Sequence, residues 1–246
     1  MFHVEHGQPA ATRSPLISAV SEGPIPAGLE RDASVFLDRL PLLCPDATPL
    51  QITGWGQQLY RYVSLLYVWS GRTNLVSPQD RMKLATRHLL PSLAMRRVVL
   101  GLPHQIVADL GSGSGLPGVP LKISLPGTSF QLIETRRRRA NFLREVVRKL
   151  ALDRVEVVNS RIEDWECPES ARPDVIVSRA VMASDQLVRC CTGLLRPGGR
   201  VLFTLPAEAT LDAYGPGSPR IVETGVEDSV GRGIRIGVLT LDSAAP

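Results

Sequence analysis

The chain has 246 residues, 43% of them hydrophobic, and a formal net charge of +4. This length supports one sizeable domain, or a domain with an appendage, and excludes a small disulfide-stapled fold. No apolar run reaches the roughly 18 residues of a membrane span, and the opening residues lack the basic flank and apolar stretch of a secretory signal. The four cysteines show no metal-binding spacing. We therefore expect a cytoplasmic protein with no metal site and no membrane association.

The first hundred residues predict a helical region behind a flexible extension. Residues 1–31 are rich in proline, alanine, serine and glycine without a sustained apolar period, which is typical of a flexible segment. Over residues 32–102, apolar side chains recur every three or four positions, as in amphipathic helices. One helical stretch, from Gln79 to Leu100, contains Pro91, which we expect to kink or break it because proline has no amide hydrogen.

Residues 103–246 predict an α/β domain with a Rossmann-like sheet. Short β-branched runs alternate there with helix-length segments, which is typical of a mostly parallel sheet wrapped by helices. The last two runs follow one another without a helix and predict an antiparallel pair at the edge, giving seven strands in total. The predicted strands are QIVADLG, TSFQLIE, VEVVN, DVIVSRA, RVLFTL, RIVETGVE and IRIGVLTL, and the predicted helices cover Leu116–Leu125, Arg136–Ala151 and Asp185–Leu195.

A glycine-rich segment follows the first predicted strand. Asp109 precedes four glycines, Gly111, Gly113, Gly115 and Gly118, which let backbone amides approach a ligand at the end of a strand. The last three form a GxGxxG pattern. A dinucleotide site, and with it an NAD-dependent oxidoreductase, is therefore one alternative. A carboxylate at position 109 instead suits the ammonium group of an amino-acid ligand. The third alternative is a turn that serves chain geometry alone.

Two further strand ends carry residues suited to a nucleoside. Glu134 ends the second predicted strand, where a carboxylate can accept hydrogen bonds from both ribose hydroxyls, although it is alternatively an ordinary exposed glutamate. Ile162 and Glu163 follow the third predicted strand, where they can flank an adenine ring and bind its edge. Together with Asp109, this order and spacing favour S-adenosylmethionine as the cofactor.

These segments resemble a known family. DLGSGSGLPGVPL, LIETRRRRANFL, NSRIEDW and DVIVSRAV, with LYVWSGRTNLVS and RHLLPSL in the helical region, are similar to the RsmG (GidB) family of small-subunit ribosomal RNA methyltransferases, over roughly Gln57 to Leu241. The resemblance implies a class I S-adenosylmethionine-dependent methyltransferase fold and methylation of guanine N7 in the 530 loop of 16S rRNA. The implied partner is 16S rRNA or the small ribosomal subunit, and nothing in the sequence requires more than a monomer. The cofactor contacts implied by the resemblance are Gly111, Leu116, Ile162, Glu163 and Arg179, with Asp109, Gly113 and Glu134 beside them.

The chain departs from the family pattern at two places. Pro91 stands where the family usually has an aspartate, and Leu205 and Pro206 stand where a lysine and a glycine usually end the fifth strand. That lysine is a plausible contact for substrate or phosphate. A relative that binds cofactor and RNA with impaired turnover is therefore a second hypothesis.

The implied reaction needs no general base. Guanine N7 carries a lone pair and no proton, so proximity and alignment supply most of the acceleration. No catalytic residue is assigned, and the candidates near the reacting groups are Arg179, Arg87 and His88. Arg179 could instead pair with a carboxylate, and His88 could be a packed or surface histidine.

Four consecutive arginines, Arg136, Arg137, Arg138 and Arg139, begin the helix after Glu134. Such a run is usually a solvated face, but arginine also suits phosphate contacts and stacking on unpaired bases. At least one of Arg138 and Arg139 occupies the family's Lys-Arg position, so the resemblance also allows a supporting role at the cofactor site.

Overall fold

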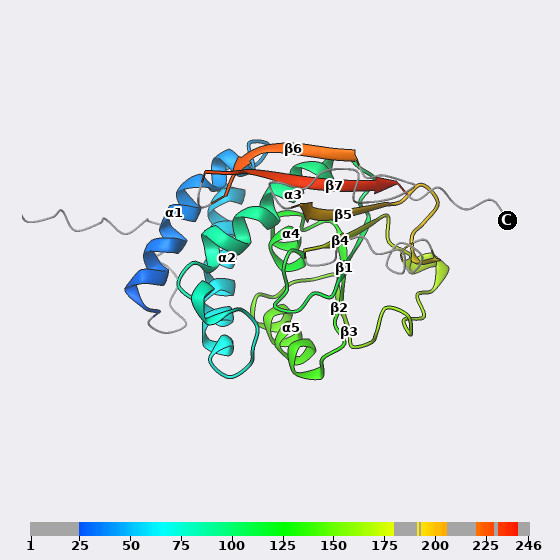
Figure 1. Cartoon of the computed structure of the whole chain (residues 1–246), viewed down its shortest axis with the longest axis horizontal. Coiled ribbons are helices and arrows are strands. Elements are labelled where there is room, and N and C mark those ends of the chain that lie inside the picture. The colour runs from blue at the N-terminus through cyan, green and yellow to red at the C-terminus, as the bar shows by residue number, and fades with distance from the viewer. Residues whose placement is uncertain (1–24, 180–190, 192, 206–219, 229–230, 241–246) are drawn as a thin grey trace, which may run out of the picture.

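The computed structural model describes residues 25–179, 191, 193–205, 220–228 and 231–240, and contains a seven-stranded sheet within them (Figure 1). The strand order is β3-β2-β1-β4-β5-β7-β6. Strands β1 to β5 pair in parallel, β7 is antiparallel to β5, and β6 is antiparallel to β7. The bounds are β1 Ile106–Leu110, β2 Ser129–Ile133, β3 Val155–Val158, β4 Val175–Ser178, β5 Arg200–Leu205, β6 Arg220–Glu227 and β7 Gly233–Thr240. The predicted fold class is confirmed.

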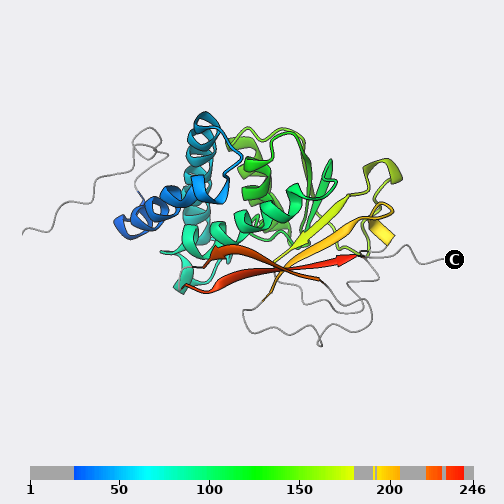
Figure 2. The same ribbon diagram turned by 90° about the horizontal axis from the view of Figure 1, so that it is seen from above.

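Helices α1 (Ala27–Leu43) and α2 (Pro49–Ser70) precede the sheet and lie outside the helices that contact it (Figures 1 and 2). Thr48 caps α2, because its side chain accepts a hydrogen bond from the Gln51 amide while the Gln51 side chain accepts one from the Thr48 amide. Helix α1 begins at Ala27, so residues 27–31 are helical rather than part of a flexible extension. The reason is that Leu29 is fully buried and begins the apolar face of α1.

The chain around Pro91 changes helix type. A π-helical turn, η2 (Ala85–Leu89), runs directly into α3 (Leu90–Leu100), and the Leu90 amide donates to the Ala85 carbonyl five residues back. The proline is the second residue of α3, where a missing amide hydrogen costs little. The expected break therefore takes the form of a π-to-α transition. Short 3₁₀ turns, η1 (Pro78–Asp80) and η3 (Glu169–Ala171), occur before η2 and after β3.

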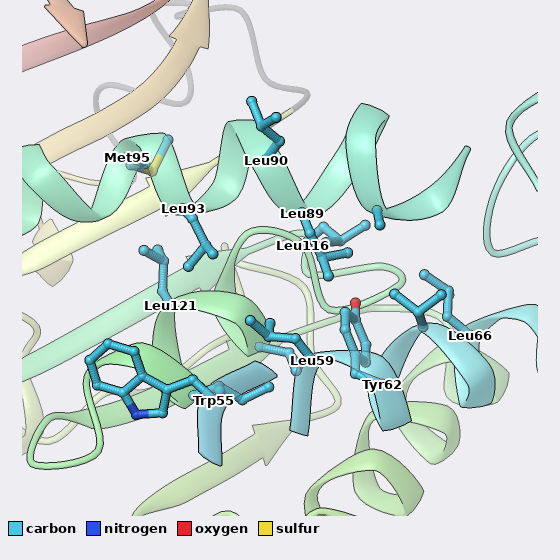
Figure 3. Packing of buried hydrophobic residues seen from close by; sticks show 14 of the residues in the cluster. Trp55, Leu59, Tyr62, Leu66, Leu89, Leu90, Leu93, Met95, Leu116 and Leu121 are labelled. Carbon is cyan, nitrogen blue, oxygen red and sulfur yellow. The ribbon is translucent and has the colours of Figure 1, made fainter. Parts of the chain in front are cut away.

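The sheet separates two apolar clusters. Alternate strand residues such as Val107, Leu132 and Val177 belong to one buried cluster with side chains of all five helices, which include α4 (Gly118–Ser124) and α5 (Arg137–Lys149). On the other face, Ala108 and Ile133 pack with Cys191, Leu194, Leu195 and the segment after β3. Figure 3 shows how the first cluster joins side chains of α2 to those of η2, α3 and the glycine-rich segment. The carboxyl ends of β1, β2 and β4 meet at one edge, where the candidate residues lie.

Candidate active site

The segment after β1 has a backbone that requires glycine. Gly111, Gly113 and Gly115 have φ angles of +67°, +56° and +89°, a conformation that side-chain-bearing residues rarely adopt. At Gly118 an added Cβ would lie 2.6 Å from the Asp109 Oδ2 atom. At Gly111, by contrast, no atom lies within 4 Å of the position of an added Cβ. The loop backbone therefore borders open space at Gly111, as expected for a ligand-binding loop.

Asp109 is a buried carboxylate with one unused oxygen. Its Oδ2 atom accepts a hydrogen bond of 3.0 Å from the Gly118 amide, whereas its buried Oδ1 atom has no hydrogen-bond partner. Burial raises the pKa of Asp109 to about 7, against the lowering influence of the Gly118 hydrogen bond and of the Arg179 charge. A buried acceptor without a partner is costly, so this oxygen is suited to a cationic donor from a ligand.

Glu134 connects the end of β2 to two neighbouring segments. Its Oε2 atom accepts a hydrogen bond of 2.9 Å from the Gly113 amide, and its Oε1 atom accepts one of 2.7 Å from the Arg136 amide. The side chain is 4% exposed, so it is not the ordinary surface glutamate of the alternative interpretation. The Thr135 hydroxyl also donates to Oε1, at 3.3 Å, so the remaining capacity for a further donor, such as a hydroxyl, is on Oε2.

Two hydrogen bonds connect the helical region to the glycine loop and to the helix after Glu134. The hydroxyl of the fully buried Tyr62, on α2, donates a hydrogen bond of 2.5 Å to the Ser114 carbonyl. Arg139 donates a hydrogen bond of 2.7 Å to the Asn74 carbonyl and lies beside Gly113. The sequence does not reveal this role of Tyr62, because its position in an apolar helical pattern indicates only core packing.

The other cofactor candidates differ in their surroundings. The Leu116 side chain is buried in the core beside Tyr62 and Leu89, so a ligand contact there would use its backbone (Figure 3). Ile162 is half-buried against the apolar cluster on the second sheet face. Glu163 is exposed, and the structure shows no hydrogen bond from it to another described residue.

A charged cluster lies at the end of β4. Arg179 follows that strand and its Nη1 atom lies 2.8 Å from the Nδ1 atom of His88. The His88 Nε2 atom lies 3.7 Å from the Asp80 Oδ2 atom, and Arg87 forms an ion pair with Asp80. Burial and the Arg179 charge lower the pKa of His88 to about 4, so His88 is neutral at pH 7 and its contact with Asp80 is not an ion pair. Since Arg179 can only donate, Nδ1 is the acceptor and the proton of His88 is on Nε2, facing Asp80.

This cluster borders a cavity of about 460 Å³. Its walls come from η2 and α3, the ends of β4 and β5, and residues just after β6 and at the start of β7. Burial raises the pKa values of Asp109 and Tyr62, and the Arg179 charge opposes this rise in both, so Arg179 lies near the glycine loop as well as in the cavity wall. Leu205 forms part of the wall, while Pro206 lies outside the described residues. The lining residues are Arg87, His88, Pro91, Arg179, Thr204, Leu205, Asp228, Arg232, Gly233 and Ile234.

The arginines of α5 divide into two groups. Arg136, Arg137 and Arg138 are exposed around the first turn of the helix, and the structure shows no side-chain hydrogen bond from them to described residues. Arg139 is half-buried and makes the contact with Asn74. Positive charges at a helix N-terminus are unfavourable for helix stability, so the exposed group is not explained by local stability.

Comparison with known proteins identifies the family. Residues 56–212 match the model of GidB, described as rRNA small subunit methyltransferase G. The ribosomal RNA small subunit methyltransferase G of Stenotrophomonas maltophilia is 39% identical over 183 residues, covering 74% of this chain and 80% of the relative. The chain belongs to the GidB family. The protein of the same name from Mycobacterium leprae is 45% identical over 143 residues, which cover 58% of this chain and 57% of the relative.

A solved structure of low sequence identity shares the fold. The S-adenosylmethionine-dependent methyltransferase from Aquifex aeolicus is 19% identical, with a TM-score of 0.50 over 69% of this chain and 96% of that one. The family is one of methyltransferases, so the NAD-dependent oxidoreductase hypothesis drawn from the GxGxxG pattern is not supported. The GxGxxG pattern did not distinguish the two classes of protein, because the same glycines also fit a loop that follows a buried carboxylate, Asp109.

Two other properties concern the described residues only. No helix among them is both long and apolar enough to span a membrane. They also contain no group of three or more histidine, cysteine, aspartate or glutamate side chains arranged to hold a metal ion.

Proposed function

We propose that this GidB-family protein transfers the methyl group of S-adenosylmethionine to N7 of guanine in the 530 loop of 16S rRNA, and that it acts as a cytoplasmic monomer on naked 16S rRNA or the small ribosomal subunit. The observation that carries the proposal is the unpartnered, buried Oδ1 atom of Asp109 beside the glycine loop. The relatives, each called a ribosomal RNA small subunit methyltransferase G, support the choice of RNA as substrate.

The residues at the strand ends fit the cofactor. Asp109 Oδ1 would accept from the methionine ammonium, and Glu134 Oε2 would use its remaining lone pair for a ribose hydroxyl. The backbone of Gly111 and Gly113 would border the ligand, with Ile162 and Glu163 near the adenine. When bound, S-adenosylmethionine supplies an electrophilic methyl group.

The chain's own task is to position the base. Guanine N7 needs no deprotonation, so neutral His88 is not required as a base, and we assign it instead to orient Arg179 through their 2.8 Å contact. Arg179 and Arg87 would contact the nucleotide in the cavity that both line. Arg136, Arg137 and Arg138 are exposed and available for phosphate contacts elsewhere on the RNA.

A second candidate function has one observation in its favour. Leu205 brings an apolar side chain to the cavity wall where the family pattern usually has a lysine, which fits a relative that binds both ligands with impaired turnover. The double variant Leu205→Lys with Pro206→Gly separates the two candidates. A large gain in turnover with unchanged cofactor affinity would favour the impaired relative, and little or no gain would favour the active enzyme.

The direct test is methyl transfer from labelled S-adenosylmethionine to unmethylated small ribosomal subunits and to naked 16S rRNA, followed by mapping of the label. We expect one labelled guanine in the 530 loop. Label found only on a small metabolite would refute the substrate. Calorimetric titration with S-adenosylhomocysteine and with NAD tests the cofactor separately, and binding of NAD alone would refute it.

A further inference from the structure

A second cavity adjoins the first one on the outer side of the molecule. It has a volume of about 350 Å³ and lies between α1, the residues that lead into η2, and the end of β6. Asp228 lines both cavities, so they are neighbours across this residue. We call the two together the basic groove, defined by Arg31, Arg39, Lys83, Arg87, Arg179 and Arg232 with the residues between them.

The charges of the basic groove are mostly positive. Six arginine or lysine side chains and two aspartates line the two cavities. Asp32 accepts hydrogen bonds from the Ala85 and Thr86 amides, so its charge is directed at the start of η2. Asp228 forms an ion pair of 3.2 Å with Arg232. His88 is neutral at pH 7 and does not alter this balance.

Some of these cations have no structural task that explains them. Arg39 donates a hydrogen bond of 3.1 Å to the Glu227 carbonyl and thereby joins α1 to β6. Arg31 and Lys83 are exposed, and the structure shows no hydrogen bond or ion pair from either side chain to another described residue. Two cations on facing elements of one cavity repel each other, so their placement favours an anionic ligand.

The outer cavity also offers apolar surface. Val35 on α1 is 54% exposed and Met82 before η2 is 45% exposed, and both line this cavity. Apolar side chains between cations suit a ligand that alternates anionic groups with flat apolar ones. A single-stranded nucleic acid has this alternation of phosphates and bases.

We propose that single-stranded RNA lies in the basic groove, with its phosphates on Arg31, Lys83 and Arg232 and the target nucleotide in the inner cavity beside Arg179. This inference rests on the proposed function and deepens it, because it assigns the surface that RNA follows to reach the reacting centre. The basic groove is favoured over the exposed arginines of α5 because its outer cavity adjoins, at Asp228, the cavity that Arg179 lines.

The test compares two double charge reversals of the full chain. Arg31→Glu with Lys83→Glu alters the basic groove, whereas Arg61→Glu with Lys149→Glu makes the same charge change at exposed helical positions that line neither cavity. Binding to unmethylated small ribosomal subunits is measured by filter retention across a range of salt concentrations. Loss of two phosphate contacts to a single strand makes the negative slope of log K against log salt shallower by about 1.4. Binding is then about 25-fold weaker at 0.1 M salt.

We expect that loss for the groove variant only, with S-adenosylhomocysteine affinity unchanged in both variants. The exchange Arg31→Lys with Lys83→Arg keeps both charges and should retain binding. Equal affinity of the groove variant and wild type would overturn the inference, as would loss confined to Arg137→Glu with Arg138→Glu on α5. Polyglutamate could also compete with the subunits for the wild-type protein as strongly as RNA does, and fail to compete for the groove variant. That result would indicate an acidic protein partner and would also overturn the inference. Wild-type protein that binds S-adenosylhomocysteine but neither subunits nor rRNA would instead refute the proposed function.

Discussion

The pKa of Asp109 gives a quantitative prediction for cofactor binding. Burial raises this pKa to about 7 in the ligand-free protein, and the buried Oδ1 atom has no partner. An ammonium group binds the ionised carboxylate and not the protonated one, so the ligand must first shift the protein toward the ionised form. Affinity should therefore rise with pH until the carboxylate is ionised in the free protein.

The size of the effect follows from the ionised fraction. With a pKa of about 7, roughly 3% of Asp109 is ionised at pH 5.5 and about half at pH 7, so the Kd should tighten about 15-fold over this interval. The amino group of the ligand stays protonated there, since such groups have pKa values of roughly 7.7–8.0. His88, whose pKa is lowered to about 4, also does not titrate in this interval.

Calorimetric titration with S-adenosylhomocysteine measures this dependence, because this product carries the same amino group without the reactive methyl. The variant Asp109→Asn keeps an oxygen for the 3.0 Å hydrogen bond from Gly118 but cannot ionise, so it should bind weakly at every pH. Asp38→Asn, at an exposed position of α1, is the matched control and should behave as wild type. A Kd that stays constant from pH 5.5 to 7, or an Asp109→Asn variant that keeps the wild-type slope, would refute the reasoning.

Three further predictions concern stability. Gly118→Ala places a Cβ 2.6 Å from Asp109 Oδ2 and should lower the free energy of unfolding by about 1–3 kcal/mol. Gly127→Ala, at a position with open space, is the control and should not lower it. Equal losses in the two variants would contradict this prediction. Tyr62→Phe removes the 2.5 Å hydrogen bond to the glycine loop. It should lower the free energy of unfolding in urea by about 1–3 kcal/mol and should also weaken cofactor binding. A variant with wild-type stability and wild-type cofactor affinity would contradict this prediction. Because the pKa of His88 is about 4 when folded, below its ordinary value of 6.5, the unfolded chain binds the extra proton, and stability should fall by about 3 kcal/mol from pH 6.5 to 4. The raised pKa of Asp109 acts in the opposite direction, so this loss is measured in the Asp109→Asn background, where a flat profile would contradict it.

The strands could be predicted because parallel strands buried on both faces are nearly continuous apolar runs. The proximity of Asp109 and Glu134 could be predicted for a related reason. The carboxyl ends of neighbouring parallel strands meet at one edge, so residues just beyond β1 and β2 must lie close together. What the sequence could not indicate is that Glu134 already accepts hydrogen bonds from the Gly113 and Arg136 amides, since these depend on the path of the loop.

The cavity beside Arg179 was beyond prediction from sequence. Its walls bring together His88, Thr204 and Arg232, which come from segments separated by many residues. No spacing rule connects such residues, because their proximity depends on how η2 packs against the ends of β4, β5 and β7. The role of Asp80 was hidden for the same reason, as the chain between Asp80 and His88 is not one regular helix.

Arg179 connects the two halves of the site electrostatically. A guanidinium keeps its charge at neutral pH even where burial lowers its pKa, because its ordinary pKa is so high. On the cavity side it contacts His88, which burial keeps neutral, and on the loop side the Asp109 carboxyl is only about half ionised at pH 7. The Arg179 charge is therefore incompletely neutralised from either side and can act on an anion in the cavity.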